Sequence, residues 1–84
     1  MNNGALKKNT TLDKLKKGTF ARITQIDICD GRIFRKLIDM GVVSGSRLKI
    51  SKVVPMYDPV IFEIFGYELC LRKNIAKKIW VECL

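Results

Sequence analysis

The sequence feature that most constrains the fold is a series of short segments in which apolar and polar residues alternate, each ended by glycine, proline or a polar turn. Alternation with a period of two is typical of β-strands that bury one face. Such segments cover residues 19–28, 47–54, 60–65, 67–72 and 79–84. A chain of 84 residues can build one core at most. Closure removes exposed strand edges, so we predict a mainly β fold, a closed or nearly closed small barrel of about five strands.

The first of these segments changes parity along its length. Ala21 and Ile23 share one parity, whereas Ile26 and Ile28 share the other. A strand cannot change its buried face without an extra residue, so we predict a bulge near Thr24. Segment 60–65 is apolar on both parities apart from one glutamate, which predicts that both its faces are covered.

One segment, residues 30–40, has the apolar spacing of an α-helix. Its stripe consists of Ile33, Phe34, Leu37 and Ile38. Asp30 is a good N-cap, and Gly41 lies where a left-handed residue ends a helix. A helix of about ten residues is unstable alone in water, so we expect it to pack on the sheet.

The N-terminal region combines a basic tail with a short helical turn. Residues 1–9 are predicted to form a disordered tail, and residues 10–84 a single domain. Thr10 or Thr11 can cap the turn, which would place Leu12 and Leu15 against the barrel. Near the other end, residues 73–78 are predicted to form a short polar turn with Ile75 and Ala76 directed inward.

The residue inventory argues against catalysis. The chain has no histidine, so Ser–His and Cys–His nucleophile pairs are impossible. Neither a P-loop nor a dinucleotide-binding glycine motif is present. We therefore predict that the protein is not an enzyme. With no apolar run long enough to span a bilayer and no signal-peptide pattern at the start, we also expect no membrane insertion and a cytoplasmic location.

The cysteines do not indicate a disulfide framework, because they are three in number and far apart. Cys70 and Cys83 fall within apolar alternations and are predicted to pack in or near the core. Cys29, between Asp27 and Asp30, gives the one candidate metal cluster, although capping is the stronger interpretation of Asp30. We expect no bound cofactor. Weak binding of Fe(II) or another transition metal stays open, as does a metal-sensing role.

The formal net charge of +8 suggests an acidic partner, and a nucleic-acid-binding barrel is one interpretation. However, residues 1–17 hold five lysines and one aspartate, so half of the excess charge lies in this N-terminal stretch. The aromatic residues fall mostly on core-type positions and do not interleave with basic ones, which predicts that most are buried. Trp80 is the aromatic residue most readily placed at the surface. Nucleic acid is therefore not the expected partner.

Four motifs occur in a characteristic order. They are Thr11-Leu12-x-x-Leu15-x-x-Gly18, Leu37-x-x-x-Gly41-x-x-x-Gly45, Pro55-x-x-Asp58-Pro59 and Leu71-Arg72-x-x-x-Ala76-x-x-Ile79-x-Val81. In this order and spacing the chain resembles the FeoA family, the small ferrous iron transport proteins A, over roughly residues 12–81.

The resemblance implies an SH3-like barrel with one short inserted helix. It also implies an accessory, regulatory role in Fe(II) uptake through contact with the GTPase-containing membrane transporter FeoB. The same domain type forms the C-terminal part of some metal-dependent repressors, but this chain has no winged-helix segment. The stand-alone transport protein is therefore the nearer resemblance.

The resemblance also marks candidate residues for the fold or for partner binding. They are Leu37, Gly41, Gly45, Pro55, Asp58, Pro59, Leu71 and Arg72. Independently of the resemblance, Gly41 is expected to end the helix and Gly45 to form a turn, because glycine tolerates positive φ. Pro59 has a φ fixed by its ring. Arg72, at a strand end, could bind a carboxylate. The barrel face that meets a partner, the oligomeric state and any metal ligands are left undetermined.

Overall fold

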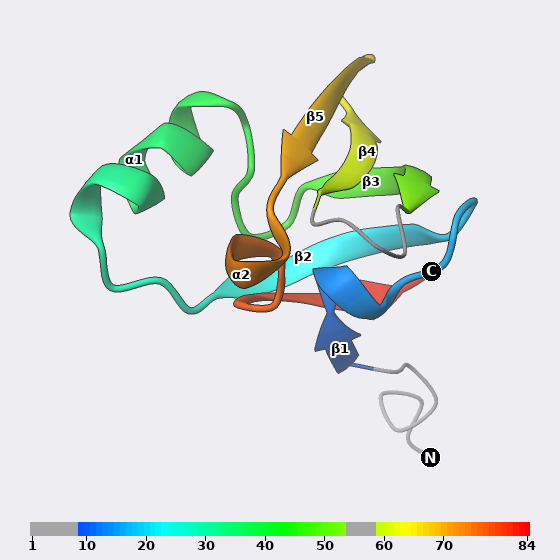
Figure 1. Ribbon diagram of the computed structural model, residues 1–84, viewed down its shortest axis with the longest axis horizontal. Coiled ribbons are helices and arrows are strands. Elements are labelled where there is room, and N and C mark those ends of the chain that lie inside the picture. The colour runs from blue at the N-terminus through cyan, green and yellow to red at the C-terminus, as the bar shows by residue number, and fades with distance from the viewer. Residues whose placement is uncertain (1–8, 54–58) are drawn as a thin grey trace.

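The computed structural model describes residues 9–53 and 59–84 and consists of one curled antiparallel sheet with three short helices (Figure 1). The elements in chain order are β1 (Asn9–Thr11), the 3-10 helix η2 (Leu12–Lys14), β2 (Phe20–Ile26), α1 (Gly31–Asp39), β3 (Arg47–Val53), β4 (Val60–Ile64), β5 (Tyr67–Leu71), α2 (Lys73–Ala76) and β6 (Ile79–Cys83). The predicted elements between residues 12 and 84 are therefore present. The loop prediction for residues 55–58 and most of the predicted tail lie outside the described residues.

The sheet has six strands in the order β1-β6-β2-β3-β4-β5. The sequence predicted about five, because the three-residue strand β1 was assigned to the tail and to the capping turn. Asn9, predicted to end the tail, pairs with Glu82 of β6. Strands β1 and β5 form the two edges of the described sheet, so the small barrel is left open between them.

The parity change in β2 has the predicted cause. The register between β2 and β6 shifts between Ile23 and Gln25, which is an irregularity of the β-bulge type. Upstream of it Ala21 and Ile23 are buried, and downstream of it Ile26 packs against the same core. The extra residue bends β2, so that its start pairs with β3 and its whole length with β6.

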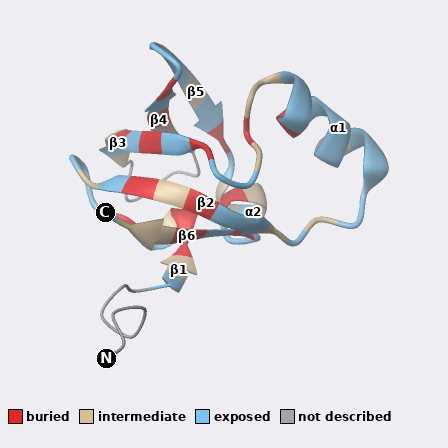
Figure 2. Cartoon of the chain, turned by 180° about the vertical axis from the view of Figure 1, so that it is seen from behind, coloured by how far each residue is buried: buried red, intermediate tan, exposed pale blue. Residues whose placement is uncertain are grey.

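The core lies on the concave side of the curled sheet, where buried residues alternate with exposed ones along the strands (Figure 2). Its largest side chain is Phe62, with Ile23, Ile50, Ile79 and Val81 around it in one cluster. Leu12 and Leu15 close the core from the N-terminal side as predicted. Ala76 is buried and Ile75 packs on the cluster, although the predicted polar turn is the short helix α2.

Helix α1 has the predicted ends. The Asp30 carboxylate accepts hydrogen bonds from the backbone N–H groups of Arg32 and Ile33. At the other end the Val42 N–H donates to the Leu37 carbonyl, and the Gly41 N–H donates to the Ile38 carbonyl. Together these bonds form a Schellman motif, which requires the left-handed conformation that Gly41 adopts at φ +87°.

The prediction that α1 packs on the sheet holds for only part of its apolar stripe. Only Leu37 is fully buried, with Ile33 packed at the edge of the core. Phe34 and Ile38 are exposed. Figure 1 shows why: the helix projects to one side of the sheet. Beyond its C-terminal end, Val42 is buried in the core.

Three further burial predictions are corrected by the structure. Strand β4 buries Val60, Phe62 and Ile64, but its other face is not covered, because the outer side of the sheet carries no second layer. Cys70 lies on that outer side of β5 and is exposed, whereas Cys83 does pack against the core. Of the aromatic residues in the described ranges, only Phe62 is in the core.

Candidate functional site

The exposed aromatic residues direct attention to a groove on the outer face of the sheet. It has a volume of about 540 Å³ and is lined by residues from β2, β3 and β4, by the Phe65–Gly66 turn and by Leu84. Leu48 and Ile64, which are buried in the core, also border it, while Phe20, Phe65 and Leu84 stand 55, 70 and 56% exposed around it. We call this site the hairpin groove.

The sheet register determines which side chains meet in the hairpin groove. Phe20 pairs with Lys49, and Lys49 pairs with Glu63, so the three residues form one row across β2, β3 and β4. The Lys49 ammonium lies over the Phe20 ring, 5.3 Å from its centroid. This contact is a cation–π interaction at a solvent-exposed site, where the stabilisation is about 0.5–1 kcal/mol. It orders both side chains at the wall of the groove.

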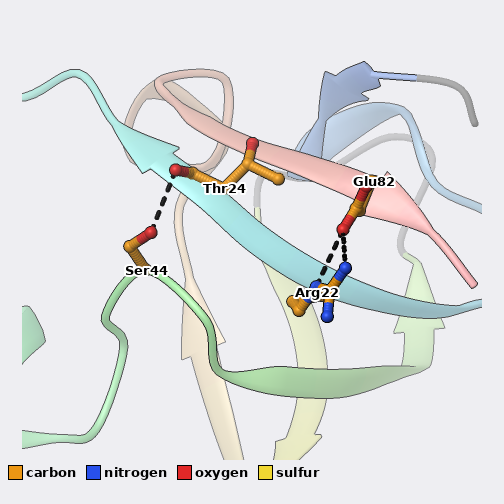
Figure 3. Close-up of polar contacts among 4 residues, drawn as sticks. All are labelled: Arg22, Thr24, Ser44 and Glu82. Atoms are coloured by element: carbon orange, nitrogen blue, oxygen red, sulfur yellow. Dashed lines mark hydrogen bonds and ion pairs between the residues drawn. The ribbon is translucent and has the colours of Figure 1, made fainter. Parts of the chain in front are cut away.

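A second row contributes a cation. Arg47 lies opposite Arg22 on β2, and both point to the outer face. Arg22 is held by an ion pair with Glu82 of β6 (Figure 3). Further along β2, the Thr24 carbonyl accepts a hydrogen bond from Ser44 Oγ in the loop before β3. Among the described residues, no carboxylate pairs with Arg47. The charge of Arg22 is therefore offset, and that of Arg47 is available to a ligand.

The turn at the end of the groove is strained. Ile64 pairs with Tyr67, which leaves Phe65 and Gly66 as a two-residue hairpin loop. Both have positive φ, +52° and +84°, the sign pattern of a type I′ turn. Asn, Asp or Gly normally occupies the first of these positions. A Cβ is unfavourable there by roughly 1–2 kcal/mol, which glycine avoids and which the short polar side chains of Asn and Asp offset by local hydrogen bonds. In the described residues Phe65 is the one non-glycine residue with positive φ.

The same hairpin contacts the end of α1. A Cβ placed on Gly41 would lie 2.6 and 2.9 Å from two atoms of the Phe65 ring, so any larger residue at position 41 would have to displace this exposed ring. The Tyr67 hydroxyl donates a hydrogen bond to the Met40 carbonyl. The hairpin therefore binds the C-terminal end of α1 on one side and borders the groove on the other.

The residues predicted from motifs do not gather at this groove. Leu37 and Leu71 are in the core, and Pro59 precedes β4. Gly45 is an exposed turn residue at φ +97°, and Arg72 is the exposed N-cap of α2. Pro55 and Asp58 lie outside the described residues. Gly41 is the one predicted residue in contact with a groove residue, through the Phe65 ring.

Sequence reasoning missed the groove because it assigned Phe20 and Phe65 to the core. A signal was available for Phe65, since it is followed by Gly66 between two alternating arms, which is the pattern of a two-residue hairpin loop. Nothing in the sequence alone shows that Leu84 and Phe20 come together. Their contact arises from the Leu84 N–H, which donates to the Phe20 carbonyl.

The candidate metal cluster is not assembled. Within residues 9–53 and 59–84, no group of three or more Cys, Asp or Glu side chains could hold a metal ion. Asp30 is used as the helix N-cap, and Cys29 is exposed beside it. Over the same ranges no helix is both long and apolar enough to cross a membrane.

Comparison with known protein families gives one match that covers nearly the whole chain. The model of the FeoA domain matches residues 10–83. A curated relative, the Fe(2+) transport protein A/Fe(2+) transporter FeoB fusion protein of Porphyromonas gingivalis, is 36% identical over 75 residues. The aligned region is 87% of this chain but only 8% of that relative, so the chain corresponds to a small part of it.

Solved structures agree on the fold. A FeoA-like protein from Clostridium acetobutylicum is 35% identical, with a TM-score of 0.77, and the match covers 92% of this chain and 88% of that one. A manganese-dependent transcriptional repressor gives a TM-score of 0.84 at 20% identity, covering 93% of this chain and 43% of the repressor. At that identity the second likeness concerns the fold only.

Proposed function

Because the chain belongs to the FeoA domain family, we propose that it is an accessory protein of ferrous iron transport that binds a FeoB-type GTPase transporter from the cytoplasmic side and regulates it. The observation that carries this proposal is the Porphyromonas gingivalis relative, in which a transport protein A part and a FeoB part share one polypeptide. Fusion of two proteins keeps them at high effective concentration, which is useful where the two parts associate.

The architecture supports a role in binding. The fold exposes large apolar side chains around a groove on an uncovered sheet face, and such surfaces on small soluble domains mark interaction sites. We assign no catalytic step to the chain. In this proposal Fe(II) is the cargo of the transporter, and the accessory protein does not hold it as a resident cofactor.

The test measures both physical association with the transporter and the effect on iron uptake. The full chain is crosslinked in cells that express a FeoB-type transporter, and Fe(II) uptake is measured after deletion of the gene. We expect a crosslink to the transporter and reduced uptake, restored by complementation. Normal uptake together with no crosslink would refute the proposed function.

A further inference from the structure

We propose that the hairpin groove binds an extended acidic segment of the transporter, in which carboxylates and aromatic or leucine side chains lie on the same face of the segment. This inference rests on the proposed function for the identity of the partner. The chemistry of the segment follows from the groove itself, from three observations: its apolar wall, its cations and the strained turn at its end.

The apolar wall provides the affinity. Phe20, Phe65 and Leu84 come from separate parts of the chain, yet all border one hollow. A volume of about 540 Å³ lies within the range of about 300–1,000 Å³ typical of ligand pockets. Exposed aromatic side chains around a hollow are the usual anchors of a binding surface. The groove can therefore take one or two apolar side chains of a partner.

The cations determine the charge of the partner. Arg47 and Lys49 are two residues apart on β3 and so lie on the same face, about 7 Å apart along the strand. Among the described residues, Arg47 has no carboxylate partner, and the Lys49 ammonium lies over the Phe20 ring, with Glu63 opposite Lys49 on β4. An extended segment with carboxylates at positions i and i+2 would match this spacing, because those two side chains share one face. Apolar side chains further along the same face, at i−2 or i+4, would then fit between the Phe20 and Phe65 rings.

The strained turn is the independent observation. An aromatic residue at φ +52° is less stable there than Asn or Gly, and its ring is 70% exposed, so burial returns little of the cost. Backbone strain of this kind is characteristic of functional positions. A binding partner that covers the Phe65 ring would supply the missing burial. The strain thus points to a ligand at the same place as the exposed apolar side chains.

Two other occupants fit the groove less well. A second copy of the chain would bring together two molecules of formal net charge +8, which repel each other. A nucleic acid would place phosphates beside Glu63, which sits between the cations and the turn on β4. A peptide can instead direct a backbone N–H or a lysine at Glu63. The charges of the groove therefore favour a peptide.

The experiment uses the full chain, labelled with ¹⁵N, and follows its amide resonances during titration. The probes are the purified cytosolic part of a FeoB-type transporter and a synthetic peptide with glutamates at positions i and i+2 and leucine or phenylalanine at i−2 and i+4, all on one face when extended. Matched peptides replace glutamate by glutamine, or the apolar residues by serine. A single-stranded oligonucleotide and dilution of the chain alone test the other two occupants.

Two changes in the groove have matched controls elsewhere. Phe65→Asn removes the ring but relieves the turn, so loss of binding cannot be attributed to misfolding. Arg47→Gln combined with Lys49→Gln removes the two cations. As controls, Trp80→Ala removes a partly exposed aromatic ring outside the groove, and Lys77→Gln combined with Lys78→Gln removes two positive charges that also lie outside the groove.

We expect the acidic apolar peptide to shift the amides of the groove, and each groove variant to weaken binding at least about tenfold, which is about 1.4 kcal/mol. The controls should stay within about twofold. Shifts elsewhere, equal binding by the groove variants, or groove shifts caused only by the oligonucleotide or by self-association overturn the proposal. If the peptide binds in the groove but the transporter part does not bind, the proposed function fails and the groove assignment stands.

Discussion

Substitution of Gly41 by alanine separates two physical demands that coincide at the end of α1. One is conformational, because position 41 has φ +87°, where L-residues are disfavoured. The other is steric, because a Cβ would lie 2.6 Å from an atom of the Phe65 ring. Gly45 provides a matched control, since it has φ +97° and nothing within 4 Å of its Cβ position.

The expected magnitudes follow from these contacts. A left-handed alanine costs roughly 1–2 kcal/mol, partly offset by the lower entropy of the unfolded chain, so Gly45→Ala should cost about 1 kcal/mol. Gly41→Ala must also move the Phe65 ring to a less favourable rotamer, which adds about 1 kcal/mol. For a domain of 84 residues, each kcal/mol corresponds to about 4–8 °C in Tm. Valine at position 41, being β-branched, should be more destabilising than alanine.

The assay is urea unfolding of the single variants and of the double variant Gly41→Ala with Phe65→Asn. Removal of the ring should reduce the cost of Gly41→Ala to that of Gly45→Ala, which gives a coupling free energy of about 1 kcal/mol in the double-mutant cycle. Equal costs at positions 41 and 45, with no coupling to Phe65, would refute the steric part of the argument. No loss of stability in either variant would refute the conformational part.

Three further predictions test separate features. Phe65→Asn should raise Tm by a few degrees in thermal unfolding, because asparagine tolerates positive φ and the lost ring is largely exposed; a fall in Tm would mean that the ring contributes more to the fold than the turn strain costs. Asp30→Ala should lower the free energy of unfolding by about 1 kcal/mol through loss of the two N-cap hydrogen bonds, and an unchanged urea midpoint would contradict that role. In thiol labelling followed by mass spectrometry, the exposed Cys29 and Cys70 should react before Cys83, which packs against the core. First reaction at Cys83 would show that β6 is not protected as described.

The parts of the fold that sequence reasoning predicted are those with a local physical cause. The α1 boundaries follow from the Asp30 cap and the Gly41 stop, which act within a few residues of the chain. The bulge in β2 follows from parity, because Ile23 and Ile26 cannot both face the core across a regular strand. Periodicity of this kind is independent of the rest of the molecule.

The errors share a different cause. Alternation shows which residues share a face of a strand, but it does not show whether that face is covered. In a domain this small much of the surface stays exposed, so Phe20, Phe65 and Cys70 remain on an outer face without a second layer. The three-residue strand β1 is too short to show a period, and it exists only because β6 lies beside it.

The hairpin contact with α1 gives the groove a thermodynamic link to the helix. The Phe65 ring borders the groove and also limits the space beside Gly41, and the Tyr67 hydroxyl binds the last turn at Met40. A ligand that favours one orientation of the ring changes the freedom of the helix end. By reciprocity, whatever holds the helix end changes the affinity of the groove by the same factor. The C-terminal end of helix α1 is therefore a place from which the binding strength of the groove can be adjusted.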